Sequence, residues 1–334
     1  MRILVVTQMW PSAAEPGFGA FVAQICRALE RDGHELEVVA IDRRGLPKTK
    51  YVTLFRQARA AARRFKPDVV YAHFLAPAGV IAARASRAPL VLTAHGTDVA
   101  NLERGAWARA FTRIATRRAY AVIAVSGWLR DRLVGHLPEL EGRVEVIDSG
   151  VDLELFAPRD QEAARAQVGW DGEGPRFLFV GTLDGRKRAE ALADAFEGLG
   201  RGSLAFVGDG PVRERLEGRE DIRVVGRLPH EQVADWIAAC DYLCQPTDGE
   251  AFGQAILEAM ASERSVLATT RGGPPEFVTP EAGVLVDPRE EGAIERGLRA
   301  LVELPSPNPA ARTAATLHDV RVQAGRVAEI LRSA

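Results

Sequence analysis

The sequence predicts an α/β protein made of two doubly wound parallel sheets. Short apolar runs, typical of buried parallel strands, alternate with amphipathic helical segments along the chain. The alternation occurs twice, once on each side of a segment rich in Gly and Pro at residues 149–175. The length of 334 residues is about twice that of a typical domain, which also favours two domains.

Six apolar runs in the first half are the expected strands. They span residues 3–7, 36–41, 69–72, 90–93, 121–125 and 144–147. Helical patterns fill the intervals near residues 18–32, 53–65, 77–86, 104–119 and 127–135. Because each helix carries the chain back to the same edge, this order predicts a parallel sheet.

The second half repeats the pattern. Strands are expected at 177–180, 204–207, 222–225, 242–245, 265–268 and 283–286, and helices near 187–199, 211–218, 230–239, 253–262 and 289–303. After three prolines between 305 and 309, one last helix is expected over about 310–332. We therefore expect a first domain at 1–157, a second at 158–308, and a segment, 309–334, that returns to the first. Two such sheets facing each other would form a ligand cleft lined by strand ends.

The composition is that of an ordinary globular protein, with 47% hydrophobic and 26% charged residues. No apolar run approaches the roughly 18 residues of a membrane span, and the first apolar run is too short for a signal peptide. The three cysteines form no CxxC pair, which argues against a zinc or redox motif and favours the cytoplasm.

Charge divides unevenly along the chain. Residues 1–150 contain 22 Lys and Arg against 14 Asp and Glu, a net charge of +8, and the remainder carries −10. The basic half is consistent with a solvated surface, and an anionic partner is the alternative. Nucleic acid is not expected as a partner. The basic half has no exposed aromatic residues interleaved with its Lys and Arg, and it contains no nucleic-acid-binding motif. A basic amphipathic pattern at 53–66 is typical of an ordinary surface helix, with contact to an anionic membrane as the alternative.

Two segments of the first half are candidate sites. The loop containing Gly17 and Gly19 precedes a helix, so its backbone could approach an anion at the helix start. It is not a GxGxxG fingerprint, and a simple loop glycine pair is the alternative. His95-Gly96-Thr97-Asp98 follows a predicted strand, where polar side chains reach the ligand edge of a sheet. Alternatively, His95 is a core histidine and Asp98 caps the next helix.

Three segments of the second half complete the candidates. Arg186, Lys187 and Arg188 precede a helix, where cations are unfavourable unless an anion such as a pyrophosphate binds there; a solvated charge run is the alternative. Gly208-Asp209-Gly210 is interpreted as a structural turn. In the segment 248–258, Glu250 lies on a loop and Glu258 lies on a helix among apolar residues, where its carboxylate needs donors such as sugar or ribose hydroxyls. The alternative is that Glu250 is a solvated loop residue and that Glu258 is a helix residue paired with a cation.

These motifs together resemble the family-4 retaining glycosyltransferases of the GT-B fold, over nearly the whole chain. The most specific match is E-x-F-G-x-x-x-L-E-A-M-A at residues 250–261, followed by Gly272-Gly273-x-x-Glu276. The glycine loop, the H-G-x-D of 95–98 and the linker 147–156 also match. The start of the chain, with Trp10-Pro11-Ser12, is most similar to TuaC-like enzymes of cell-surface polysaccharide assembly.

The resemblance implies a UDP- or GDP-sugar donor held mainly by the second half. It implies that His95, Glu250 and Lys187 are catalytic and that Asp98 lies on the acceptor side. The donor-binding set that it implies is Gly17, Gly19, Arg186, Lys187, Arg227, Leu228, Phe252, Gly253, Gln254 and Glu258. Glu258 would bind the ribose, Lys187 the pyrophosphate, and the backbone near Arg227 and Leu228 the base.

The implied acceptor is a glycan or a lipid-linked phosphate, met at the inner face of the plasma membrane. No cofactor is expected, and no metal, because no DxD-type carboxylate cluster is present. Thr182 stands where the family usually has Arg, and Arg186 is the candidate replacement for that charge. The alternatives are a sugar-nucleotide epimerase of the same fold and a non-catalytic nucleotide-sugar-binding subunit.

Overall fold

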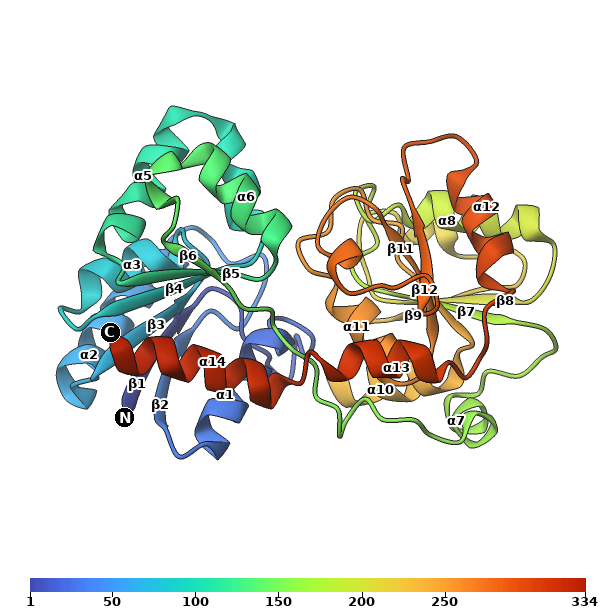
Figure 1. Ribbon diagram of the computed structural model, residues 1–334, viewed down its shortest axis with the longest axis horizontal. Coiled ribbons are helices and arrows are strands. Elements are labelled where there is room, and N and C mark those ends of the chain that lie inside the picture. The colour runs from blue at the N-terminus through green and yellow to red at the C-terminus, as the bar shows by residue number, and fades with distance from the viewer. The chain divides into compact units, whose positions relative to one another are not determined.

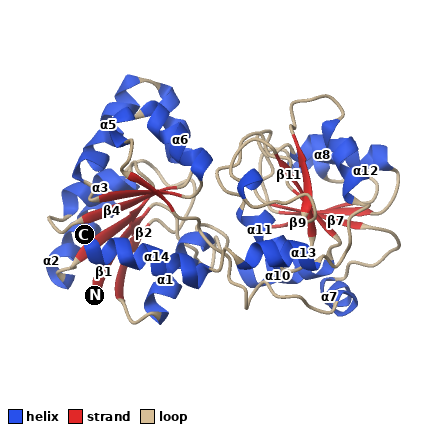
Figure 2. Ribbon diagram, viewed as in Figure 1, coloured by secondary structure: helices blue, strands red, loops and turns tan.

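The structure, a computed structural model, describes residues 1–334 and divides into two compact units. The N-terminal unit contains residues 1–150 together with 320–334, and the C-terminal unit contains residues 151–319. Each unit is a parallel six-stranded sheet with helices on both faces (Figures 1 and 2). None of the helices combines the length and apolar character that a membrane crossing requires.

The sheet of the N-terminal unit has the order β2-β1-β3-β4-β5-β6. Its strands are β1 (Arg2–Thr7), β2 (Glu35–Ala40), β3 (Val69–His73), β4 (Leu90–Ala94), β5 (Ala121–Ala124) and β6 (Val144–Val146). Its helices are α1 (Ala20–Arg31), α2 (Lys50–Phe65), α3 (Ala78–Ala85), α4 (Thr97–Ala100), α5 (Ala106–Arg118), α6 (Gly127–His136) and α14 (Val320–Ser333). The central strands β3 and β4 are buried along their whole length, because helices cover both of their faces.

The last helix, α14, packs beside α1 on one face of this sheet (Figure 1). Its buried face joins the core formed by α1 and by strands β1, β3 and β4. The chain leaves and re-enters the unit at one place: a Cβ on Gly150 would lie 2.5 Å from Cα of Val320. Gly150 has φ +66°, so both its conformation and this close approach require glycine.

The sheet of the C-terminal unit has the order β12-β11-β10-β7-β8-β9. Its strands are β7 (Arg176–Val180), β8 (Ser203–Val207), β9 (Ile222–Gly226), β10 (Tyr242–Cys244), β11 (Ser265–Thr269) and β12 (Gly283–Val286). Its helices are α7 (Gln161–Val168), α8 (Ala189–Leu199), α9 (Arg213–Leu216), α10 (His230–Ala239), α11 (Gln254–Ala261), α12 (Ala293–Leu301) and α13 (Pro309–Thr316). Aromatic side chains of β7 and β8 fill the core against α8.

The predicted fold class is confirmed, and all twelve predicted strands are present. Two expectations were wrong. The segment 149–175 is not only a linker, because it contains α7, whose N-cap Asp160 accepts a hydrogen bond from the N–H of Ala163. The single last helix is two helices, α13 and α14, which belong to different units and are separated at residues 317–319.

The strand order indicates where a ligand is expected to bind at the edge of each sheet. In an open parallel sheet, ligands bind beyond the carboxyl ends of the strands where the strand order reverses. This point lies between β1 and β3 in the N-terminal unit and between β7 and β10 in the C-terminal unit. The loops that follow these strands are therefore the ones to examine for a site.

Candidate functional site

An ion pair joins the two loops at the reversal point of the C-terminal sheet. Lys187, after β7, places its Nζ 2.5 Å from Oε2 of Glu250, after β10, and both side chains are only 13% exposed. Burial by itself raises the pKa of Glu250, but the charge and hydrogen bond of Lys187, aided by Arg186, outweigh it and hold that pKa below its ordinary value. Glu250 is therefore a carboxylate at neutral pH.

Backbone contacts fix both members of this pair. The Lys187 N–H donates to Oδ1 of Asp184, and the Glu250 N–H donates to the carbonyl of Arg271. A Cβ on Gly272 would lie 1.8 Å from the Glu250 carbonyl oxygen, so only glycine permits this approach. A Cβ on Gly208 would likewise lie 1.8 Å from the Gly181 carbonyl oxygen, which confirms the structural turn predicted there.

A second carboxylate lies on α11. Glu258 is 3% exposed, and its Oε1 lies 2.9 Å from Nε2 of His230, the first residue of α10. The ring of Phe156 packs on His230 with centroids 5.1 Å apart. A buried carboxylate needs a donor, and this histidine supplies one. The alternative prediction of a paired Glu258 is thus correct in part, with His230 as the partner.

The start of α11 lies beside this carboxylate in sequence. Gly253 is its N-cap, with φ +106°, and makes no side-chain cap, because glycine has no side chain. Phe252 is buried against Phe277, with ring centroids 5.2 Å apart. Gln254 opens the helix itself. Such a helix start can bind an anion or a hydroxyl oxygen.

The remaining predicted donor residues lie on loops at the same edge of this sheet. Arg186 donates to the carbonyl of Gly249, and Thr182 is exposed. Arg227 is exposed after β9, 3.6 Å from a carboxylate oxygen of Asp209, and Leu228 is half-buried beside it. All of these loops follow parallel strands of one sheet, so they lie at one edge.

The glycine loop of the N-terminal unit has a structural reason of its own. A Cβ on Gly19 would lie 2.6 Å from the carbonyl carbon and oxygen of Met9, and Gly19 has φ +82° as the N-cap of α1. Gly17 is exposed. The loop therefore brings backbone to the start of α1 without a side-chain cap, the geometry on which the predicted anion contact depends.

Asp98 organises the segment that carries His95. It is 3% exposed, and its carboxylate accepts backbone N–H groups from Leu75, His95, Gly96 and Val99 at 2.9–3.1 Å. Burial raises the pKa of Asp98, and these four donors oppose that effect. Oδ1 accepts from His95, Gly96 and Val99 and Oδ2 accepts from Leu75, so Asp98 holds two loops together.

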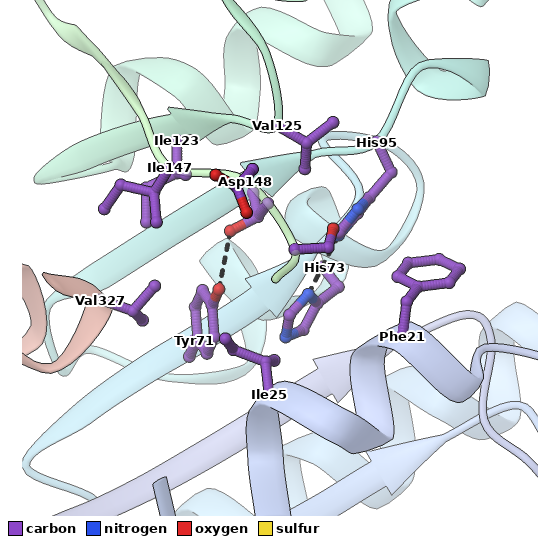
Figure 3. Close-up of a pocket in the computed structure, with 12 residues that line it drawn as sticks. Phe21, Ile25, Tyr71, His73, His95, Ile123, Val125, Ile147, Asp148 and Val327 are labelled. Atoms are coloured by element: carbon purple, nitrogen blue, oxygen red, sulfur yellow. Dashed lines mark hydrogen bonds between the residues drawn. The ribbon is translucent and has the colours of Figure 1, made fainter. Parts of the chain in front are cut away.

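His95 lies in an aromatic cage. The rings of Phe21 and Phe74 pack on it with centroids 4.9 and 4.8 Å away. Its Nε2 lies 3.0 Å from Nδ1 of His73, and Figure 3 shows this bond with Phe21 nearby. Burial lowers the pKa of His95 to about 3, so the ring is neutral. A neutral imidazole donates one hydrogen bond and accepts another.

Neither metal nor thiol chemistry has a built site in the structure. No group of three or more His, Cys, Asp or Glu side chains is arranged to hold a metal ion. The three cysteines are buried, and burial raises the pKa of Cys240 to about 12, so this thiol is not a nucleophile at neutral pH.

Known families match both units. Residues 17–155 match the family described as Glycosyltransferase Family 4, and residues 174–303 match the one described as Glycosyl transferases group 1. The GDP-mannose-dependent alpha-mannosyltransferase of Mycolicibacterium smegmatis is 31% identical, over 86% of this chain and 84% of that protein. The chain belongs to glycosyltransferase family 4. Its activity is therefore that of a glycosyltransferase.

Other relatives of this glycosyltransferase agree. The putative teichuronic acid biosynthesis glycosyltransferase TuaC of Bacillus subtilis is 27% identical, over 89% of this chain and 88% of that protein. Among solved structures, sucrose-phosphate synthase from Thermosynechococcus elongatus has a TM-score of 0.81 at 19% identity, with 99% and 98% of the two chains covered. Anabaena HepE in complex with UDP-glucose has a TM-score of 0.81 at 23% identity, with both chains fully covered. These likenesses confirm the GT-B fold.

Sequence reasoning missed two histidines in this glycosyltransferase. His73 ends β3, one residue beyond the predicted strand, and His230 begins α10 directly after Pro229. His73 could have been found, because it stands at the carboxyl end of a strand next to the one that precedes His95. His230 carries no such signal, since only the folded chain brings it to Glu258.

Proposed function

We propose that this glycosyltransferase moves a sugar from a UDP- or GDP-sugar to a glycan or lipid-linked acceptor, with retention at the anomeric carbon. The observation that carries the proposal is the buried Lys187–Glu250 pair at the reversal point of the C-terminal sheet. HepE is described in complex with UDP-glucose, and the mycobacterial relative is described as GDP-mannose-dependent, so both donor classes have precedent.

In this proposal, the diphosphate competes with Glu250 for the Lys187 ammonium. The pyrophosphate oxygens replace the Glu250 carboxylate as the partner of the Lys187 ammonium. Glu250 is then released and can accept hydrogen bonds from hydroxyl groups of the transferred sugar. The Phe252 N–H donates to the Glu250 carboxylate and so orients it, and Gly253 and Gln254 at the start of α11 offer their backbone to the same sugar. Glu258 accepts the ribose hydroxyls, and His230 holds its carboxylate in place.

The leaving group is a nucleoside diphosphate, and its developing charge needs fixed donors. Lys187, Arg186 and the first N–H groups of α11 supply them in the proposal. The glycine loop of the N-terminal unit, with Gly17 and Gly19 at the start of α1, is proposed by itself to offer backbone to an anion. The loop at Arg227 and Leu228 contacts the base. Because cations and helix N–H groups fill this role, we propose that transfer does not depend on a divalent metal.

The acceptor is assigned to the N-terminal unit. We propose that His95, as a neutral imidazole, donates a hydrogen bond to the transferred sugar near its anomeric centre. Asp98 acts by holding the His95 loop. The basic charge of this half suits an acceptor that carries phosphate. The name of the TuaC relative supports a role in cell-envelope polysaccharide synthesis.

We further propose peripheral contact with the inner face of the plasma membrane through the N-terminal unit. On α5, Trp107 and Phe111 are 67% and 38% exposed and lie one turn apart on the same face. A groove of about 520 Å³ near the end of α5 contains no carboxylate. Its arginines are Arg59, Arg63, Arg84, Arg87 and Arg118. Exposed aromatics toward the start of α5 and a groove of arginines at its end suit an anionic lipid surface.

The donor proposal is tested by thermal shift against UDP, GDP, ADP and their sugars in the presence of chelator. One nucleotide should raise Tm, because a ligand of the native state stabilises by mass action. The shift should vanish in Glu258→Ala and persist in Glu303→Ala, which removes an exposed glutamate. No shift at millimolar nucleotide would contradict the proposal.

Product analysis then separates the chemical outcomes. With acceptor present, NMR of the product should show the donor's anomeric configuration. Free sugar and nucleotide without acceptor would favour the epimerase alternative, and an inverted product would contradict retention. Full activity in chelator is expected, and dependence on added magnesium would overturn the metal-independent mechanism.

The membrane proposal is tested by co-sedimentation with vesicles. The protein should bind vesicles containing phosphatidylglycerol and not pure phosphatidylcholine. Trp107→Ser with Phe111→Ser should weaken binding at least fivefold, whereas Tyr120→Ser, another exposed aromatic beyond the end of α5, serves as the control. Equal binding to both kinds of vesicle would refute a basic anchoring surface.

A further inference from the structure

A histidine that the proposed mechanism does not use lies directly behind His95. His73 is 1% exposed, and its Nδ1 lies 3.0 Å from Nε2 of His95 (Figure 3). Its other ring nitrogen, Nε2, is buried and has no hydrogen-bond partner. We infer that His73 is a positioning residue, which donates its Nδ1–H to His95 and thereby fixes His95 as the tautomer with hydrogen on Nδ1. This inference rests on the proposed contact of His95 with the sugar.

The direction of the hydrogen bond follows from the two possible tautomer pairs. Burial holds the pKa of both rings below the ordinary value, so both are neutral and one hydrogen lies between them. If His95 donated, the Nε2 of His73 would be a buried N–H without an acceptor. If His73 donates, that nitrogen is only an unused lone pair. Unpaired buried N–H groups are rarer than unpaired acceptors, so His73 is the donor.

His73 cannot itself meet a sugar. The space beside its ring is about 10 Å³, far below the volume of a monosaccharide, and apolar side chains such as Ile123, Val125 and Val327 line much of it. The Tyr71 ring packs on His73 with centroids 4.3 Å apart. His73 is thus locked in place and acts only through His95.

His95 has the complementary arrangement. Its ring is partly exposed, and its Nδ1 makes no hydrogen bond within the chain. With Nε2 occupied by the Nδ1–H of His73, the hydrogen of His95 must be on Nδ1, where a ligand oxygen can accept it. Three titratable groups lie around the pair: Tyr71, which bonds Thr93 at 2.9 Å, Asp148, which accepts the Gly150 N–H, and Asp98, which accepts the His95 N–H.

The test is ¹⁵N NMR of the histidine rings in the full-length protein at pH 7. The chain has six histidines, and the His95 signals are identified by their loss in His95→Phe. The wild type should show hydrogen on Nδ1 of His95. His73→Phe keeps a ring but removes the donor, so His95 should become a mixture of tautomers. His73→Asn places an amide N–H where Nδ1 was and should restore the Nδ1–H form.

Turnover should follow the tautomer. His73→Phe should lower kcat five- to tenfold, the effect of about one neutral hydrogen bond, with nucleotide affinity unchanged. His73→Asn should recover most of it, and Tyr71→Phe, which deletes the bond to Thr93 in the same pocket, should stay within twofold. Hydrogen on Nε2 of wild-type His95, or wild-type kcat and tautomer in His73→Phe, would overturn the inference. If no donor is turned over, the proposed function fails, while the NMR result still decides the role of His73.

Discussion

Glu250→Gln tests the ion pair at the centre of the proposed donor site. The change keeps the shape of the side chain but removes the charge that Lys187 faces at 2.5 Å, where both groups are 13% exposed. A hydrogen bond to a charged group is worth about 1.5–3 kcal/mol. We expect the C-terminal unit to lose about 2 kcal/mol of unfolding free energy, which lowers Tm by about 4–8 °C for a unit of this size.

The loss should depend on pH in a defined direction. Lys187 holds the pKa of Glu250 below its ordinary value of 4.5, so the charged form favours the folded state. Its contribution is fully present above pH 4.5 and is lost as pH falls through the lowered pKa. The wild type and Glu250→Gln should therefore differ most at neutral pH and converge in acid.

The assay is scanning calorimetry of the wild type, Glu250→Gln, Lys187→Met and the double variant, from pH 7 down to pH 3. If the pair is coupled, the double variant should be about 2 kcal/mol more stable than the sum of the single losses predicts. Additivity within 0.5 kcal/mol at pH 7 would refute the reasoning. In the same variants, turnover of a donor sugar should fall at least a hundredfold in Glu250→Gln.

Three further changes test the supports of the site. Gly272→Ala places a Cβ 1.8 Å from a backbone oxygen and should cost about 3 kcal/mol or more in calorimetry, whereas Gly218→Ala, with open space around it, should cost about 1 kcal/mol; equal costs would contradict the clash. His230→Phe should weaken nucleotide binding about fivefold by titration calorimetry, because Glu258 loses its donor; unchanged affinity would separate His230 from the site. Asp98→Asn should cost the N-terminal unit about 2 kcal/mol, because an amide NH₂ in place of Oδ2 would face the Leu75 N–H; a cost within 0.5 kcal/mol would show that the carboxylate is dispensable.

The strand pattern was predictable because parallel strands buried on both faces are short apolar runs bounded by turns. The helix α7 was missed because its sequence, Gln161–Val168, is polar and lies between prolines and glycines. Its N-cap Asp160 was the available signal. The division of the last helix at residues 317–319 was hidden, because a helical pattern continues across Leu317 and His318. Only packing against different units separates the two helices.

The sequence predicted which loops carry the candidate site residues, but it did not predict which side chains those residues contact. Glycines and polar residues after strands marked the loops of Lys187, Glu250 and His95, because strand ends of a parallel sheet share an edge. Pairing depends on side chains that meet across elements, as His230 does with Glu258 and His73 with His95. The hydrophobic periodicity of a sequence predicts helices and strands, but it does not predict which side chains of different elements meet.

The return of α14 to the N-terminal unit has a consequence for biosynthesis. A ribosome releases the whole of residues 151–319 before the helix that completes the core of the first unit. The unit that comes second in the chain can therefore finish folding first, while the earlier sheet waits with the face beside α1 uncovered. The same order governs chimaeras between relatives: an exchanged C-terminal unit must be residues 151–319, with 320–334 kept from the parent that supplies the first sheet. A single crossover near residue 150 would join α14 to a foreign partner.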